Sequence, residues 1–224
     1  MRRRSARGRG RGPDWRVVHQ VSSWCLSYPD DEVLERMPAL RQAVAEQPDS
    51  EPIKHLRAFL DHVEEVPSGA LVREYIDLFD LSRQHTLYLS YWTDGDTRRR
   101  GSTLAEFKQH YRDSGFLVDT RGELPDHLPL VLEYAAVADP EGGLRLLEHY
   151  RAGLELIRLS LAEQGASYTD VLSAVCATLP GRAPDTKAEA MALARTGPPT
   201  ESVGIEFLGY PTARPEAEFQ ESGH

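Results

Sequence analysis

Glu123-Leu-Pro-Asp-His127 lies directly before the apolar run Leu128–Ala138, and the two together predict a loop that leads into a buried helix. A Pro-Asp pair is typical of a helix start, because an aspartate side chain can accept hydrogen bonds from the free N–H groups of the first turn. We therefore predict that Asp126 is the N-cap of a helix over His127–Val137. The flanking glutamate and histidine would then lie at the positive end of the helix dipole, where the histidine pKa tends to fall.

Apolar residues recur at helical spacing over most of the chain up to Leu179. Asp14 and Ser50 stand where N-caps are expected, and Gly115 stands where a helix would end. A proline inside the second segment, Pro38, predicts a kink. The further helices expected are Trp15–Leu26, Asp31–Glu46, Pro52–Val66, Ala70–Leu81, Thr97–Ser114, Pro140–Glu163 and Thr169–Leu179.

One segment, Arg83–Trp92, fits two kinds of secondary structure. Its apolar residues recur every second to fourth position, so that periodicity alone allows a helix or a strand. The helical neighbourhood favours a helix. Asp94-Gly-Asp96 follows as a turn, in which Asp96 or Thr97 would cap the next helix.

These patterns predict an all-α fold, a single-domain bundle of roughly eight to ten helices. Residues 14–180 form the helical domain in this interpretation. Residues 1–13 are rich in arginine and glycine and are predicted to be a disordered arm. Residues 181–224 are rich in proline and glycine and are predicted to be loosely ordered, with one weak helix near Lys187–Ala194.

Charge is distributed unevenly along the chain. Residues 1–16 hold seven arginines and one acid, which leaves 19 basic and 34 acidic residues elsewhere, a balance of −15. Such a surface favours basic partners and repels nucleic acid, although the arginine arm alone could touch RNA or an acidic surface. No apolar run is long enough for a membrane span, and no apolar segment of a secretory signal follows the basic start. The two cysteines, Cys25 and Cys176, lie in helix-like segments and are expected to be reduced thiols, with a disulfide as the alternative.

Motifs for metal binding or catalysis are weak. The histidines and cysteines lack the spacing of a zinc site, so that we predict no metal and no cofactor. Asp94-Gly-Asp96 resembles the start of a calcium loop, but arginines 98–100 follow where oxygen ligands would be needed. The sequence contains no nucleophile elbow, P-loop or dinucleotide fingerprint.

Three separated segments carry a resemblance to a known family. They are Glu74-Tyr-Ile-Asp-Leu-Phe-Asp-Leu-Ser82, Tyr91-Trp-Thr-Asp-Gly-Asp-Thr-Arg98 and Glu123-Leu-Pro-Asp-His127. In order and spacing they resemble the redox-enzyme maturation chaperones, most closely the nitrate reductase molybdenum cofactor assembly chaperones (the NarJ-type delta subunits). The resemblance extends over roughly Trp15 to Leu179.

The resemblance implies a cytoplasmic chaperone without enzyme activity. Such a protein binds the N-terminal segment of the nitrate reductase alpha (catalytic) subunit and supports molybdenum cofactor insertion before membrane docking. The alternative client is another molybdoenzyme, of the dimethyl-sulfoxide or trimethylamine-oxide reductase type. A cofactor-binding helical enzyme and a nucleic-acid-binding regulator remain as competing classes.

The resemblance also suggests where the client peptide binds. Aromatic side chains would anchor an amphipathic client helix, and acidic side chains would attract its basic residues. The alternative is that the aromatic residues belong to the core and the aspartates cap helices. The candidate residues are Glu123, Pro125, Asp126, His127, Tyr75, Asp80, Tyr88, Tyr91, Trp92, Asp94 and Asp96.

Overall fold

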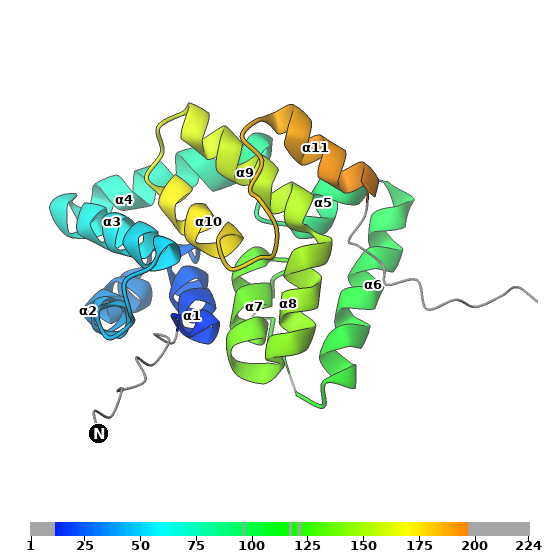
Figure 1. Cartoon of the computed structure of the whole chain (residues 1–224), viewed down its shortest axis with the longest axis horizontal. Coiled ribbons are helices and arrows are strands. Elements are labelled where there is room, and N and C mark those ends of the chain that lie inside the picture. The colour runs from blue at the N-terminus through cyan, green and yellow to red at the C-terminus, as the bar shows by residue number, and fades with distance from the viewer. Residues whose placement is uncertain (1–11, 96, 117, 121, 197–224) are drawn as a thin grey trace, which may run out of the picture.

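The computed structural model describes residues 12–95, 97–116, 118–120 and 122–196, and within these ranges the regular structure is helical. This confirms the all-α prediction. The α-helices, shown in Figure 1, are α1 (Trp15–Cys25), α2 (Asp31–Ala45), α3 (Glu51–Glu65), α4 (Ser68–Tyr75), α5 (Leu89–Asp94), α6 (Arg98–Asp113), α7 (Leu128–Glu133), α8 (Pro140–His149), α9 (Arg151–Glu163), α10 (Tyr168–Cys176) and α11 (Lys187–Thr196).

The centre of the bundle is α10, which packs against α1, α3 and α9. Its inward-facing residues are fully buried because helices cover it on several sides; they include Tyr168, Val171, Leu172 and Val175. Tyr168 packs edge-on against Phe79 and lies 4.9 Å, between ring centroids, from Phe59. Helix α1 packs between α10 and α7, so the first and last parts of the helical region share one core.

Some helix ends follow from local chemistry. The Asp14 carboxylate accepts a hydrogen bond from the Arg16 backbone N–H at 3.0 Å, as its predicted role as N-cap requires. Ser50 occupies the N-cap position of α3, but its side chain makes no capping hydrogen bond. Gly115 follows α6 with φ of 76°, a conformation that glycine adopts without strain.

The segment Pro140–Glu163, predicted as one helix, is two helices in the structure. The break falls at Tyr150, whose φ and ψ of −95° and 14° leave the helical region. Tyr150 is buried and stacks on Phe107 of α6 with 5.2 Å between ring centroids. The bend lets α8 pack on the turn 134–138 while α9 packs on α10. Apolar periodicity continues through such a bend, which is why the sequence does not reveal it.

Segment Arg83–Trp92 is also divided. A short 3₁₀ turn over Arg83–His85 is followed by extended backbone at Tyr88, and only then does α5 begin. Two other helices, α4 and α7, each end in a wider π-helical turn, over Ile76–Asp80 and Tyr134–Ala138.

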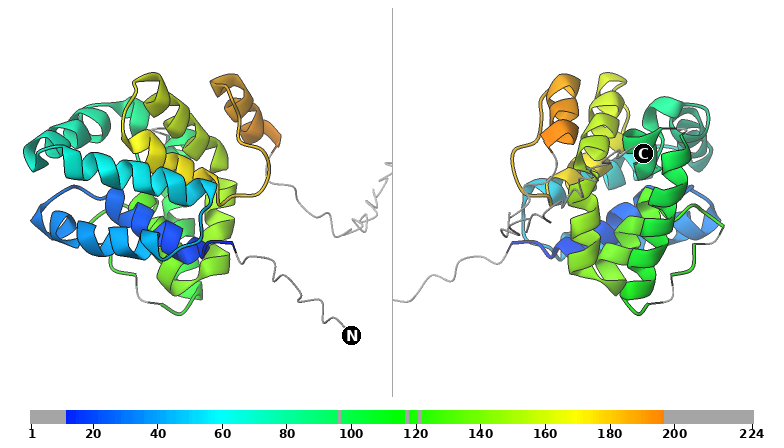
Figure 2. Two further views of the ribbon diagram at one scale, coloured as in Figure 1. Left: turned by 60° about the vertical axis from the view of Figure 1, so that its left-hand side comes forward. Right: turned by 90° about the vertical axis from the view of Figure 1, so that its right-hand side faces the viewer.

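The last described element, α11, covers α9 at the rim of the bundle, as the three views in Figures 1 and 2 agree. It begins at Lys187 as predicted, and its Ala190 is fully buried. The arm before residue 12 and the tail beyond residue 196 lie outside the described residues. No helix in the described part of the chain is both long and apolar enough to cross a membrane.

Candidate functional site

The segment Arg83–Trp92 and the loop Glu123–His127, both singled out in the sequence, meet in the structure. Backbone hydrogen bonds join them: Leu89 N–H donates to the Asp126 carbonyl at 3.0 Å, and Leu128 N–H donates to the Leu87 carbonyl at 2.8 Å. Between these bonds Tyr88 and His127 form an antiparallel bridge. The pairing places the Tyr88 and His127 rings 5.2 Å apart and brings both side chains to one surface.

The role predicted for Asp126 is wrong. It does not cap its own helix, since the N-cap position of α7 belongs to His127. Its side chain is fully buried and accepts hydrogen bonds from the backbone N–H and the hydroxyl of Ser90, at 3.0 and 2.6 Å. Arg100 lies 3.9 Å from the same oxygen. Asp126 therefore accepts a hydrogen bond from a free backbone N–H in the first turn of α5. The pairing of the two loops places its side chain beside α5 instead of at the start of α7.

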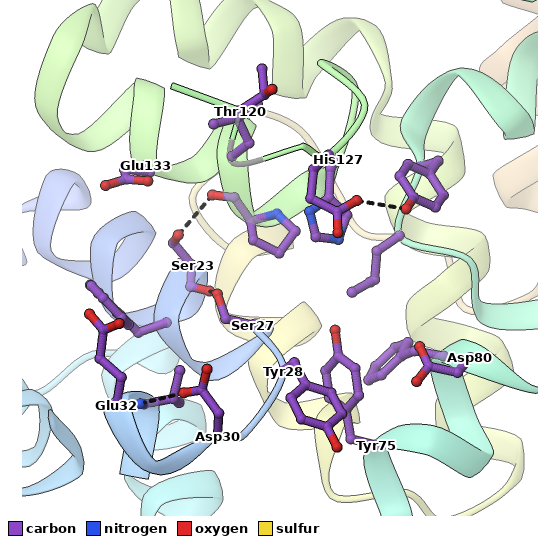
Figure 3. A pocket seen from close by; sticks show the side chains of 18 of the residues that line it. Ser23, Ser27, Tyr28, Asp30, Glu32, Tyr75, Asp80, Thr120, His127 and Glu133 are labelled. Carbon is purple, nitrogen blue, oxygen red and sulfur yellow. Dashed lines mark hydrogen bonds between the residues drawn. The ribbon is translucent and has the colours of Figure 1, made fainter. Parts of the chain in front are cut away.

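Tyr88 and His127 face a cleft of about 510 Å³ between α1, the start of α2, the turn after α4 and the loop before α7. Figure 3 shows His127 on one side of the opening and Tyr28 and Tyr75 opposite. The aromatic residues of its wall are Trp24, Tyr28, Tyr75, Phe79 and Tyr88. Tyr75 holds the wall together: its ring lies 5.5 Å from Tyr28 and 4.9 Å from Phe79, and its hydroxyl donates to the Leu26 carbonyl at 3.1 Å.

The cleft is acidic. The carboxylates that line it are Asp30, Glu32, Asp80, Asp119, Glu123 and Glu133, and none of its described lining residues is lysine or arginine. In Figure 3 Asp30, Glu32 and Glu133 lie on one flank and Asp80 on the other. Because unlike charges attract most strongly where water is partly excluded, this wall favours a cationic ligand.

Burial fixes the protonation states on the Tyr88 side of the cleft. It lowers the pKa of His127 below its usual value, even though Glu123 and Asp126 act in the opposite direction. It raises the pKa of Tyr88 to about 12, and the hydrogen bond with Glu123 adds to this shift. The Tyr88 hydroxyl donates to the exposed Glu123 carboxylate at 2.8 Å. At neutral pH His127 is therefore uncharged, and it does not offset the negative charge of the wall.

Five of the eleven predicted site residues line the cleft: Tyr75, Asp80, Tyr88, Glu123 and His127. Pro125 is buried and is not part of the lining, and its carbonyl accepts a hydrogen bond from the Tyr111 hydroxyl at 2.5 Å. Asp126 is buried and accepts the hydrogen bonds from Ser90 described above. Asp96 lies outside the described residues.

The other three predicted residues, Tyr91, Trp92 and Asp94, are not part of the cleft lining. Trp92 lies against Gly153 of α9, and its indole N–H donates to the Thr86 carbonyl at 3.1 Å. Asp94 accepts a hydrogen bond from Thr103 at 2.6 Å and so joins α5 to α6. For Trp92 and Asp94 these contacts are the core packing and helix-end chemistry of the alternative interpretation. A role of any of the three residues in client binding stays a prediction.

Sequence reasoning missed the contribution of α1 and of the loop after it. Trp24 and Tyr28 supply aromatic surface, and the Ser23 hydroxyl donates to the Pro129 carbonyl at 2.7 Å, which ties α1 to α7. The segment Tyr28-Pro-Asp-Asp31, an aromatic residue beside two acids at a helix start, was the available signal. Among the described residues no three side chains of the metal-binding types come together as a ligand set.

Comparison with known proteins gives a consistent set of relatives. A family model described as nitrate reductase delta subunit matches residues 42–174. The nitrate reductase-like protein NarX of Mycobacterium tuberculosis is 40% identical over 167 residues, which are 75% of this chain and 25% of that protein. The probable nitrate reductase molybdenum cofactor assembly chaperone NarJ of Bacillus subtilis is 31% identical over 166 residues, 74% of this chain and 90% of that protein. NarJ of Escherichia coli is 28% identical over 150 residues, 66% of this chain and 63% of that protein. The chain thus spans a quarter of NarX but most of the Bacillus protein.

Proposed function

The chain belongs to the nitrate reductase delta subunit family, and from this we propose that it is a nitrate reductase molybdenum cofactor assembly chaperone. In this proposal it binds the N-terminal segment of the alpha subunit in the cytoplasm, supports molybdenum cofactor insertion, and releases the subunit before membrane docking. It catalyses no reaction and holds no cofactor of its own. The helical domain, residues 14–180, binds the client in this proposal.

The acidic, aromatic cleft is the observation that supports client binding. A short basic, amphipathic helix has apolar side chains for the rings of Tyr75, Phe79 and Tyr88, and cations for the surrounding carboxylates. The aromatic wall and the Glu123 side of the opening come from different parts of the chain, so the cleft exists only in the folded domain.

Reversible binding is expected from the magnitudes. Each apolar client side chain buried in the cleft contributes about 1.5–3 kcal/mol, while association costs about 4–15 kcal/mol. Three or four anchors therefore leave a modest net affinity. A chaperone that must release its client requires an affinity in this range.

The test is calorimetric titration of a peptide from the alpha-subunit N-terminus. Because rim carboxylates contribute mainly through charge, we expect Glu123→Gln and Asp80→Asn each to weaken binding about two- to fivefold at low salt. Their melting temperatures should remain close to that of the unmodified chain. Glu141→Gln, an equal charge change at an exposed position of α8 outside the cleft lining, is the matched control and should bind normally.

Two results would argue against this proposal. Unchanged affinity in both cleft variants would place the client site elsewhere on the domain. Tighter binding of a peptide from a dimethyl-sulfoxide or trimethylamine-oxide reductase would favour the alternative client.

A further inference from the structure

The chain contains a segment whose charge complements the cleft. Residues 2–11 include six arginines and no acidic residue. The cleft is lined by six carboxylates, and two of them, Asp80 and Glu133, have no ion-pair partner among the described residues. The proposed client segment is also basic, so the arm and the client would be attracted to the same acidic surface.

The arm starts close enough to reach the cleft. It precedes α1, whose eleven residues are about 16 Å long. The C-terminal half of α1 lines the cleft through Ser23, Trp24 and Ser27. Residues 2–12 can span up to about 35 Å when extended. The arm is therefore long enough to run back past α1 and place several arginines in the cleft.

The cleft aromatics already bind guanidinium groups from within the fold. The Arg36 guanidinium lies over the Trp24 ring at 4.3 Å from its centroid, and that of Arg100 lies over the Tyr88 ring at 5.6 Å. Planar guanidinium groups stack on such rings and also bind carboxylates in a bidentate manner. Because Trp24 and Tyr88 are already engaged, the partners left for an arginine of the arm are the rings of Tyr28, Tyr75 and Phe79 and the carboxylates of the wall.

We propose that the arm Arg2–Arg11 docks in the acidic cleft of its own chain and competes with the basic client segment. The inference rests on the proposed function only for the identity of the competitor. Docking of the arm itself depends on the charges and rings of the cleft alone. A client must then displace the arm, so that weakly basic peptides are excluded from the cleft.

The size of the effect follows from tethering. A short flexible tether gives an effective concentration of about 1 mM, so an arm with an intrinsic Kd of about 100 µM would weaken client binding about tenfold. The affinity of the free arm peptide and the weakening of client binding are therefore linked quantities, and each predicts the other.

The first experiment needs no client. The full chain with its six arm arginines replaced by glutamine is titrated with a synthetic peptide of residues 1–12 at low salt. We expect binding, which should be lost in about 0.5 M salt and strongly reduced when Asp80→Asn and Glu133→Gln are added. No binding at low salt, or equal binding to the chain without these carboxylates, would overturn the proposal.

The second experiment measures the client peptide against the chain with Arg2→Gln and Arg3→Gln. Affinity should rise severalfold relative to the unmodified chain, and this rise should vanish in the Asp80→Asn, Glu133→Gln background. Lys54→Gln with Lys108→Gln, an equal charge change at exposed positions outside the cleft lining, is the control and should raise affinity much less. An equal rise in the control, or a rise that depends on protein concentration, would contradict docking of the arm on its own chain.

The two proposals fail in different ways. If no variant binds the client peptide but the arm peptide still binds the cleft, the proposed client is wrong and the docking inference stands. If the client binds and the arm variants change nothing, only the docking inference fails.

Discussion

The three polar residues of Glu123–His127 divide into a surface pair and a buried support. Glu123 and His127 face the cleft together with Tyr88. Asp126, between them, faces inward and binds Ser90. Pro125 and Asp126 lie in a turn closed by the His127 N–H, which donates to the Leu124 carbonyl at 3.0 Å. This turn and the bridge between Tyr88 and His127 direct the Asp126 side chain away from the surface that Glu123 and His127 share.

Removal of the Asp126 side chain should destabilise the fold. In Asp126→Ala the buried Ser90 N–H and hydroxyl lose their acceptor, so we expect the free energy of unfolding to fall by about 2–4 kcal/mol. Asp126→Asn keeps an acceptor for Ser90 and should cost about half as much or less. Urea denaturation of both variants measures the difference. Equal stability of Asp126→Ala and the unmodified chain would mean that this contact does not support α5.

At the scale of elements, the π-helical turns shape the surroundings of the cleft. The backbone N–H of Leu81 donates to the Ile76 carbonyl at 3.0 Å, an i to i+5 bond that widens the end of α4. Phe79 and Asp80 lie within this turn and line the cleft. The second π turn, Tyr134–Ala138, instead forms the surface on which α8 packs.

Contact between α8 and that turn requires a glycine. A Cβ on Gly143 would collide with the Cα and Cβ of Ala135 and lie 2.9 Å from its backbone nitrogen. We expect Gly143→Ala to lower stability by about 1–3 kcal/mol through overpacking. Gly101→Ala is the matched control, because Gly101 lies within α6 with nothing within 4 Å of its Cβ position. That variant should gain about 0.5–1 kcal/mol. Thermal denaturation measures both melting temperatures, and a shift of the two in the same direction would contradict this account of α8 packing.

At the scale of the whole molecule, a buried charge cluster holds the C-terminal part of the described chain. Glu155 is fully buried and binds Arg158 at 2.7 Å, with Arg151 at 3.6 Å. These arginines donate in turn to backbone carbonyls of the segment that leads to α11, among them Pro180, Gly181 and Pro184. The cluster therefore fastens α11 to α9.

Disruption of this cluster should loosen α11 before the rest of the bundle. Glu155→Gln leaves two arginines without their buried counter-charge, so we expect a loss of at least about 2 kcal/mol. Hydrogen exchange should accelerate over Lys187–Leu193 more than in α10. Glu141→Gln, which removes only an exposed pair with Arg145 on α8, should stay within about 0.5 kcal/mol of the unmodified chain. Uniform acceleration along the chain would show that Glu155 supports the core as a whole.

The sequence by itself determined the helical class, the approximate helix positions and the acidic character of the site. These properties depend on neighbours along the chain: apolar spacing, caps such as Asp14, and glycines such as Gly115 that end helices. Five of the residues predicted from the family resemblance, Tyr75, Asp80, Tyr88, Glu123 and His127, line the cleft, and their binding of a client stays a prediction. The resemblance of their segments to the chaperone family agrees with the family match.

Only the tertiary structure decided which candidates share a surface. Asp126 is a polar residue beside a helix start in the sequence, but pairing with residues 87–89 turned it toward Ser90. Trp92 and Tyr88 lie four residues apart, yet the bend before α5 sent one to α9 and the other to the cleft. Trp24 and Tyr28 entered the site because α1 packs on α7. Contacts between distant segments depend on how the helices pack, and local patterns do not encode that packing directly.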